Sequence, residues 1–282
     1  MTLNRDALGK TIGPIKKDYV WRDVAIYALG VGAGYDDIEY CWEKNLKVLP
    51  TFSIASVFEF FGHVGINSGM NLAGILHGEQ ELIFHRPIPV EGSLITEGRI
   101  SGYYDKGEGK GALVVAESDT RGSDGDLLFT SILTVFSRFD GGFGGENISR
   151  KERVLPDRKP DFVVMDTPSK NQPLLYRLSG DLFDIHVDKA FAAMAGFERP
   201  IMHGLCTLGF ACRALVNKLV PGEPSKVRRL ACRFSKPLYP GTPIRTLIWK
   251  IDEKTALWTT ENMETGELAI SQGLFEYGDA PV

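Results

Sequence analysis

Two side chains that can move protons lie close together in the second half of the chain. Asp181 and His186 are five positions apart, and Gly180 stands directly before the carboxylate. A carboxylate and an imidazole within one loop and turn can hold a water molecule and exchange protons with it. Further along, His203 is followed by Gly204 and an apolar run. If that run is a helix, the Gly204 N–H lies at its positive end and can stabilise a developing oxyanion.

The elements that must position these groups occur in two copies. The stretches 84–96 and 234–246 share, with one gap, an aromatic residue, a basic residue, Pro, Gly, Ile and Thr in the same order. Each is typical of a strand that ends in a Pro-Gly turn before another strand. Helices are predicted upstream of each copy, over 51–61 and 205–219, and both are apolar nearly all round, which predicts that both are buried. The repetition indicates one supersecondary unit made twice.

Alternating strand patterns follow both helices. They include residues 113–115 and 127–136 after the first helix, and 244–251, 255–260 and 268–275 after the second. One long buried helix wrapped by an antiparallel sheet, made twice, predicts an α+β double hot-dog fold.

The domain boundaries follow from this repetition. We expect an N-terminal hot-dog repeat over 1–145, a linker over 146–167 and a C-terminal hot-dog repeat over 168–282. The linker is polar and charged and contains Pro156 and Pro160, as suits a connection that crosses between repeats.

The two repeats are not equivalent in their polar residues. The first has no histidine five positions after an aspartate at 21–28, whereas the second has Asp181 and His186. The sequence therefore predicts one competent site per chain, in the second repeat. His203 precedes a predicted helix, so we expect its side chain to bond to the backbone there.

Composition limits the class of protein. With 282 residues, of which 43% are apolar and 24% charged, the chain can bury a sizeable core. Its net charge of −4 and pI of about 5.8 argue against a general nucleic-acid binder. The four cysteines have no CxxC spacing and no metal-ligand spacing to a histidine, so we expect free thiols that are mainly buried.

No targeting or membrane segment is evident. The first residues lack an apolar signal segment, and the last residues do not form a Ser-Lys-Leu-type peroxisomal address. No apolar run is long enough to cross a bilayer, so we expect no membrane insertion. These observations predict a cytoplasmic protein.

Residues 176–188 resemble the signature of the hydratase 2, or MaoC-like (R)-specific enoyl-CoA hydratase, family. That signature is an aromatic and an apolar residue, Ser-Gly-Asp, any residue, Asn, Pro, an apolar residue and His. The stretches 27–33, 77–80 and 141–145 are similar to the two-repeat hydratase 2 of peroxisomal multifunctional enzymes. The resemblance covers nearly the whole chain, in order.

The resemblance implies a lyase that hydrates trans-2-enoyl-CoA to (3R)-3-hydroxyacyl-CoA, or the reverse dehydration. It implies that Asp181 and His186 hold and deprotonate the water and then protonate the α carbon, while the Gly204 N–H binds the thioester oxygen. The acyl-CoA partner would be contacted by four further residues, which are His77, Gly78, Lys106 and Phe234. The first repeat would shape the acyl pocket. Neither a metal nor a redox cofactor is implied, because coenzyme A is part of the substrate, and the expected assembly is a homodimer.

The chain departs from the family signature at one place, where Phe183 and Asp184 replace Asn and Pro. Three interpretations are open. Phe183 contacts a bulky or cyclic acyl group; or Asp184 supplies the missing polar group from a shifted loop, so that both residues face the substrate; or acyl-CoA binding is retained while hydration is weak or absent. A thioesterase that uses a carboxylate to direct water at the thioester carbonyl is a further alternative.

Overall fold

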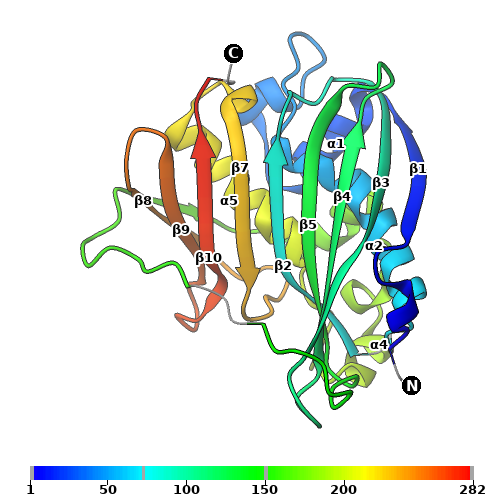
Figure 1. Ribbon diagram of the computed structural model, residues 1–282. Helices are drawn as coiled ribbons and strands as arrows, with labels where there is room; N and C mark the ends of the chain where they lie inside the picture. Colours follow the sequence, from blue (N-terminus) through cyan, green and yellow to red (C-terminus); the bar gives the residue numbers. More distant parts are fainter. Residues whose placement is uncertain (1–2, 72–73, 149–151, 280–282) are drawn as a thin grey trace.

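A ten-stranded antiparallel sheet forms one layer of the protein in this computed structural model, which describes residues 3–71, 74–148 and 152–279 (Figure 1). The strand order is β1-β3-β4-β5-β2-β7-β10-β9-β8-β6. The strands are β1 Thr11–Tyr19, β2 Ile75–Phe84, β3 Gly92–Asp105, β4 Ala112–Arg121, β5 Leu127–Ser137, β6 Phe162–Asp166, β7 Val227–Phe234, β8 Ile244–Lys250, β9 Thr255–Asn262 and β10 Leu268–Tyr277.

The strand order confirms the predicted duplication. The first half of the sheet runs β1-β3-β4-β5-β2, and the second half, taken from the opposite edge, runs β6-β8-β9-β10-β7. Adding five to each strand number of the first half gives the second half. The halves meet where β2 pairs with β7 antiparallel, from Glu79 opposite Arg233 to Ile83 opposite Arg229. The two predicted strand–turn–strand stretches are β2–β3 and β7–β8.

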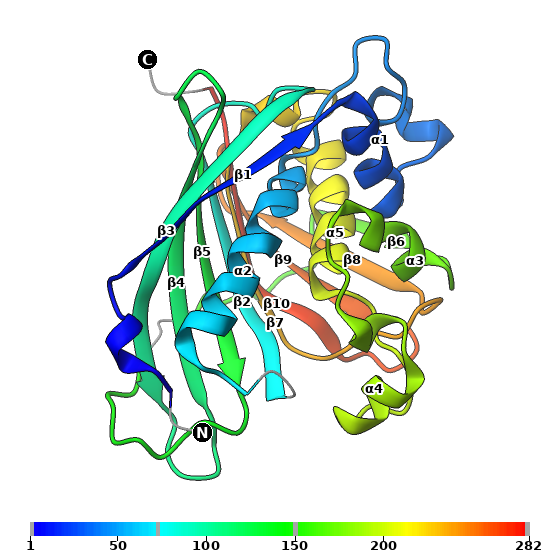
Figure 2. The same cartoon turned by 90° about the vertical axis from the view of Figure 1, so that its right-hand side faces the viewer.

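The helices cover one face of the sheet, where α2 and α5 lie next to each other (Figure 2). The α-helices are α1 Trp21–Gly30, α2 Ile54–Ser68, α3 Gln172–Tyr176, α4 Lys189–Met194 and α5 Gly204–Leu219. Short 3-10 turns are η1 Arg5–Ala7, η2 Tyr35–Tyr40, η3 Pro50–Ser53, η5 Arg177–Ser179, η6 Asp184–His186 and η7 Pro224–Lys226. One long helix against an antiparallel sheet, made twice, is the predicted double hot-dog arrangement.

The two long helices differ in burial. In α5, 11 of 16 residues are buried, as predicted. In α2, 8 of 15 are buried. Within the predicted range 51–61 the apolar residues are buried except Phe58 and Phe61, and Ile66, beyond that range, is 73% exposed. The reason is a cavity that borders one side of α2, where Phe58 and Phe61 are half-buried in its wall.

Strand β6 lies inside 146–167, the range expected to be a linker. It pairs with β8 from Phe162 opposite Ile248 to Asp166 opposite Ile244, and it forms one edge of the sheet. The strand is only five residues long and follows a charged, proline-containing stretch, but its run Phe162-Val163-Val164-Met165 is a short apolar pattern that suits a strand. Residues 149–151 of the expected linker, and the terminal residues 1–2 and 280–282, lie outside the described ranges.

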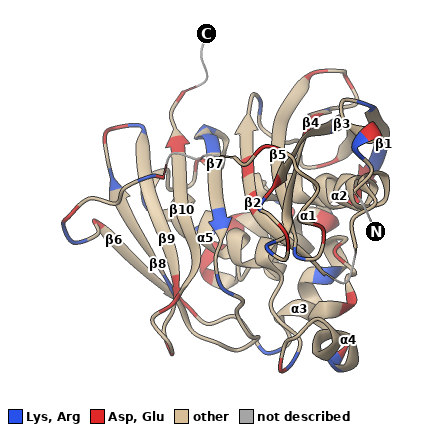
Figure 3. Cartoon of the chain, turned by 60° about the horizontal axis from the view of Figure 1, so that its bottom comes forward, with Lys and Arg blue, Asp and Glu red and all other residues tan. Residues whose placement is uncertain are grey.

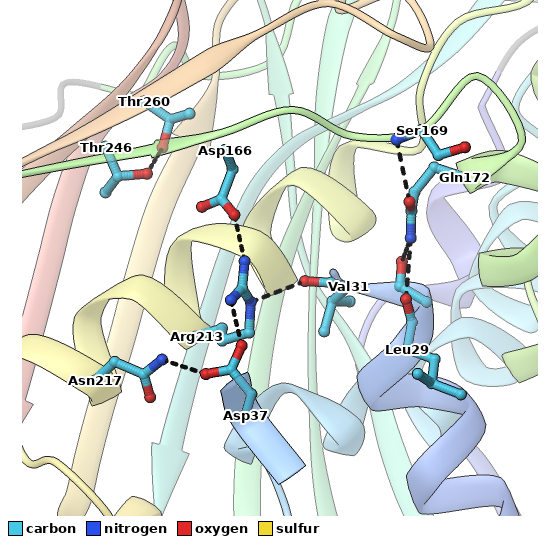
Figure 4. A network of polar contacts seen from close by, with 11 residues as sticks. Leu29, Val31, Asp37, Asp166, Ser169, Gln172, Arg213, Asn217, Thr246 and Thr260 are labelled. Carbon is cyan, nitrogen blue, oxygen red and sulfur yellow. Dashed lines mark hydrogen bonds and ion pairs between the residues drawn. The ribbon is translucent and has the colours of Figure 1, made fainter. Parts of the chain in front are cut away.

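A buried polar network fixes α5 against the first half (Figure 4). Arg213 of α5 donates hydrogen bonds to the carboxylates of Asp37, at 2.5 Å, and of Asp166, and to the Val31 carbonyl oxygen at 3.3 Å. Asn217 donates to Asp37 at 2.7 Å. Burial raises the pKa of the Asp166 carboxyl although the guanidinium opposes this. Removing one partner of such a buried group costs about 3–5 kcal/mol, so the network holds the halves in a fixed relation.

Two further expectations concern the chain as a whole. The four cysteines are free, and three of them are buried, as predicted. Within the described ranges, none of the helices combines the length and the apolar character needed to cross a membrane.

Candidate active site

Asp181 enters the core directly after a turn at Gly180. Gly180 has a φ of +128°, a conformation that residues with a Cβ rarely adopt. Asp181 is only 7% exposed, and its carboxylate accepts a hydrogen bond from the Phe183 N–H at 3.2 Å. It does not cap the next helix, because that role belongs to Asp188, whose carboxylate accepts from the Phe191 N–H at the start of α4. The Asp181 carboxylate is thus turned toward the interior of the protein.

The 3-10 turn η6 brings His186 to the same region. Its ring Nδ1 lies 2.9 Å from the Ile201 carbonyl oxygen. Because a carbonyl oxygen can only accept, Nδ1 carries the proton and the neutral ring presents Nε2 as an acceptor. Both Asp181 and His186 border the same cavity, so a small molecule there can reach the carboxylate and the imidazole together.

The separation of the two groups suits a shared water molecule. Polar side-chain atoms of Asp181, His186 and His203 lie within 4.8 Å of one another. Two hydrogen bonds of about 2.8 Å span that distance when one water lies between the groups. The structure therefore places the Asp181 carboxylate and the His186 ring close together, as the sequence predicts.

Burial changes the protonation of both groups. It raises the pKa of the Asp181 carboxyl to about 7, although the Phe183 N–H and the Arg177 charge oppose the rise. It lowers the pKa of His186 to about 4, so that ring is neutral near pH 7. A carboxyl with its pKa near the working pH can both accept and return a proton.

His203 lies beneath His186. The two rings stack with centroids 3.7 Å apart and an angle of 26° between their planes. The His203 Nε2 lies 3.3 Å from the backbone carbonyl oxygen of Asp181, so this nitrogen donates, and the expected bond from His203 to the backbone is present. Burial, with His186 nearby, lowers the pKa of His203 to about 2.

The same three side chains offer enough ligand atoms for a metal ion, but their arrangement does not fit one. Imidazole ligands bind through lone pairs in the plane of the ring, and the planes of two stacked rings do not converge on a common point. One nitrogen of each ring is also engaged with a carbonyl oxygen. We therefore assign no metal to the site.

Gly204 is the first residue of α5, as predicted. The N–H groups in the first turn of a helix have no partner within the helix, and they lie at its positive end. Gly204 borders the cavity, and a Cβ at this position would lie 3.1 Å from the Phe234 ring. The glycine keeps the backbone N–H accessible beside the proton-transfer groups.

The cavity has a volume of about 890 Å³ and is formed by both halves of the chain. All four residues expected to contact an acyl-CoA, His77, Gly78, Lys106 and Phe234, lie in its wall. His77 stands at a bulge in β2, with its ring 5.5 Å from the Phe61 ring and 5.0 Å from the Phe234 ring. Burial lowers the pKa of His77 to about 4, so it adds no positive charge near pH 7.

Lys106 is placed by a loop that one carboxylate organises. Asp105 accepts hydrogen bonds from the N–H groups of Gly107, Gly142 and Gly144 at 2.8, 2.8 and 2.6 Å. These bonds lower the pKa of Asp105, with the Gly142 bond contributing most. The glycine-rich stretch is therefore bound to the turn that carries Lys106.

Sequence reasoning missed several residues of the cavity wall. Lys236 adds positive charge to that of Lys106, and Arg233 is paired with Glu79 and Glu152 in the same wall. Both lie within two positions of Phe234, so closeness to an expected contact residue is a usable signal. The sequence predicts Phe58 and Phe61 of α2 as core residues, because a helix that is apolar all round gives no sign of a neighbouring cavity, but both lie in the cavity wall.

Phe183 and Asp184, the two residues that depart from the family signature, lie in different environments. Phe183 lies in the cavity wall, with its ring 5.2 Å from the Phe191 ring and 6.4 Å from the His186 ring, both edge-on. Asp184 is exposed and does not border the cavity, contrary to the expected substrate contact. The turn η6 directs residues 183, 185 and 186 inward and leaves 184 outside. A shifted loop that brings the Asp184 carboxylate to the substrate is not present.

Charge elsewhere is mixed. Basic and acidic residues alternate along the chain, and no broad basic area stands out in the view of Figure 3. At the seam between the two halves, Arg229 and Arg233 of β7 pair with Glu81 and Glu79 of β2.

Comparison with known proteins gives matches to both halves. Residues 152–272 match the MaoC like domain, and residues 18–139 match the MFE-2 hydratase 2 N-terminal domain. The chain is 37% identical to 3-hydroxyacyl-thioester dehydratase Y of Mycobacterium tuberculosis over 93% of this chain and 92% of that protein. It is 35% identical to a probable enoyl-CoA hydratase 2 of Dictyostelium discoideum over 96% and 95%.

Solved structures agree with these matches. A MaoC-like dehydratase from Phytophthora capsici aligns with a TM-score of 0.87 at 29% identity, over 98% of both chains. The peroxisomal multifunctional enzyme type 2 of Drosophila melanogaster aligns with a TM-score of 0.81 at 32% identity, over 94% of this chain and 48% of that one.

Proposed function

This chain belongs to the MaoC-like hydratase 2 family, and from that premise we infer that it is a hydro-lyase acting on acyl-CoA thioesters. It adds water to trans-2-enoyl-CoA to give (3R)-3-hydroxyacyl-CoA, or removes water in the reverse direction. The observation that carries the assignment is the arrangement of the buried Asp181 carboxyl and the His186 imidazole, whose polar atoms lie within 4.8 Å of each other, in one cavity wall with Gly204 at the start of α5.

Asp181, His186 and one water molecule account for every proton that moves in the reaction. His186 Nε2 accepts a hydrogen bond from the water and orients it, while ionised Asp181 takes the other proton. The oxygen forms a bond to C3 and the double bond shifts its electrons to C2. The resulting Asp181 carboxylic acid returns its proton to C2, which regenerates the carboxylate. A single water thus supplies both the hydroxyl and the proton that are added.

The Gly204 N–H acts on the charge that forms during this step. As the nucleophile bonds to C3, negative charge moves to the thioester oxygen. A preorganised backbone donor at that position is worth about 3 kcal/mol in the barrier. The helix α5 supports the donor because its first residue lies in the cavity wall and its remaining turns are packed in the core.

The cavity suits the two ends of an acyl-CoA. Positive charge from Lys106 and Lys236 can bind phosphate groups of the coenzyme, whereas Arg233 in the same wall is paired with Glu79 and Glu152. Aromatic residues from α2 and from the segment after Asp181 offer an apolar wall for the acyl group. Phe183 lies in that wall, which supports the first of the three interpretations given for this residue. In that interpretation Phe183 contacts a bulky or cyclic acyl group.

Three associated features are proposals of the same kind. We propose that catalysis needs neither a metal nor a redox cofactor, that the chain forms a homodimer, and that it acts in the cytoplasm. Metal analysis of active protein, light scattering and cell fractionation test these three points in turn.

The activity is tested with a panel of trans-2-enoyl-CoA thioesters, including linear, branched, cyclic and aromatic acyl groups. We expect loss of the enone absorbance without release of free thiol. Release of free thiol instead would identify a thioesterase. If every thioester binds and none is converted in either direction, the chain is an acyl-CoA binding protein and the assignment is wrong.

A further inference from the structure

His203 touches both members of the proton-transfer pair without bordering the cavity itself. Its ring is stacked 3.7 Å from the His186 ring, and its Nε2 lies 3.3 Å from the backbone carbonyl oxygen of Asp181. The His203 ring also contacts the buried Tyr176 ring, with centroids 4.9 Å apart and an angle of 53° between the planes. The His203 ring is therefore packed against a buried tyrosine as well as against the site.

Stability alone does not account for a histidine at this position. His203 has no exposed surface, and its Nδ1 is a buried polar atom without a hydrogen-bond partner among the described residues. An unsatisfied buried polar atom costs about 1–3 kcal/mol. A phenylalanine would fill a similar space without the unsatisfied nitrogen but would leave the Asp181 carbonyl oxygen unpaired. Packing therefore gives histidine no clear advantage, and its contacts with the site are the feature that distinguishes it.

We propose that His203 is a positioning residue that aligns Asp181 and His186, its ring face supporting the His186 ring and its Nε2–H holding the Asp181 main-chain carbonyl. The inference rests on the proposed hydratase function. It assigns His203 no bond to the substrate and no proton transfer of its own.

The two contacts restrain different motions. The stack limits tilting of the His186 ring, whose in-plane rotation is already fixed by the Ile201 carbonyl. The hydrogen bond fixes the backbone of Asp181 just after the flexible turn at Gly180. Since a misplacement of about 1 Å can cost on the order of 100-fold in rate, losing either restraint should lower turnover.

Two substitutions separate the contacts. His203→Gln keeps a side-chain N–H of similar reach and removes the ring, whereas His203→Phe keeps a stacked ring and removes the donor. We expect each to lower kcat roughly 10- to 100-fold with KM changed less than about threefold. His203→Phe removes the unsatisfied nitrogen but leaves the Asp181 carbonyl oxygen without its donor, so it should melt close to the wild type. His85→Gln, an exposed histidine bonded to Thr130, is the matched control and should leave kcat unchanged.

A measurement that needs no turnover completes the test. NMR titration of isotopically labelled histidine follows the protonation of His186 in each variant. The pKa of His186 in the wild type is low because the ring is buried. In His203→Gln water gains access to the ring face, so this pKa should rise toward 6.5, whereas in His203→Phe it should stay low.

The outcomes are distinct. If the wild type is active and both variants keep kcat, or lose kcat only in proportion to unfolded protein, His203 is structural and the inference is wrong. If the wild type converts no enoyl-CoA, the proposed function fails, and the His186 titration alone decides the inference. An unchanged His186 pKa in His203→Gln would then overturn it.

Discussion

The two halves of the sheet share one strand order but differ in the segment that leads into the long helix. In the first half, α1 is a regular helix, and its Asp23 carboxylate accepts a hydrogen bond from the Val20 N–H at 2.8 Å, as a helix start requires. In the second half, the chain turns at Gly180 and runs through two short helical turns before α5. Asp181, which lies in that irregular segment, is buried and faces the cavity.

The long helices differ in a related way. The helix α5 is packed on nearly all sides, which gives a rigid support for Gly204 at its start. The helix α2 leaves Phe58 and Phe61 in the cavity wall. A duplicated fold thus provides two similar scaffolds, of which one carries the proposed proton-transfer groups and the other shapes the space beside them.

The largest effect on kcat is expected from replacing Asp181 of the second half, and the comparison is Asp23 of the first half. Asp181→Asn should lower kcat on the preferred enoyl-CoA by about 10²–10⁴-fold, because the amide cannot take a proton from water. Asp23→Asn is the matched change in the first half, and it should leave kcat unchanged and cost at most about 1 kcal/mol of stability. Steady-state kinetics and thermal melting of both variants check this. Equal losses of activity would contradict a single site in the second half.

The next effect concerns the start of α5. Gly204→Pro removes the N–H and places a ring carbon against Phe234, with little damage to the helix, since proline is tolerated at the first helical position and His203 already has a ψ of 128°. We expect kcat to fall about 10²–10³-fold. Gly204→Ala keeps the N–H but places a Cβ against Phe234, so it should lose less activity. A proline variant as active as the alanine variant would remove the oxyanion role.

The pH dependence follows from the raised pKa of Asp181. The carboxylate form is lost as pH falls through about 7, so kcat should drop about tenfold per pH unit below that value. The same shift affects stability: the contribution of Asp181 is present at pH below its unfolded pKa and is lost as pH rises through about 7. Asp181→Asn should therefore be more stable than the wild type at pH 8, on the order of 2 kcal/mol, and not at pH 4. A flat rate profile between pH 5 and pH 8, or equal stabilities at pH 8, would contradict this shift.

The smallest effect tests the cavity wall. Phe183→Asn removes aromatic bulk beside His186 and adds a donor and an acceptor. The variant should lose severalfold in kcat/KM on a bulky enoyl-CoA and gain severalfold on crotonyl-CoA, with a stability loss of about 2 kcal/mol. Phe183→Leu, which reduces bulk without adding polarity, separates the two causes. If the wild type already hydrates crotonyl-CoA as fast as Phe183→Asn, the residue does not select the acyl group.

Much of this arrangement is predictable from local patterns. The paired strand–turn–strand stretches and the apolar helices reveal the duplicated fold, and the resemblance of the chain to a known family singles out Asp181, His186 and Gly204. The position of Asp184 is not predictable, because one 3-10 turn decides which of four adjacent residues face inward. The contact between His203 and His186 depends on packing between residues 17 positions apart, which no periodicity reports.

The account's central claim is that one site, built by the second half, holds the thioester while the first half helps to enclose the acyl group. A crystal structure of Asp181→Asn with a trans-2-enoyl-CoA bound tests this most directly, because the variant should bind without turnover. We predict the thioester oxygen within hydrogen-bond distance of the Gly204 N–H, C3 facing position 181 and His186, and the acyl group between Phe183 and α2. A thioester bound away from Gly204, or an acyl chain that contacts only the second half, would contradict the claim.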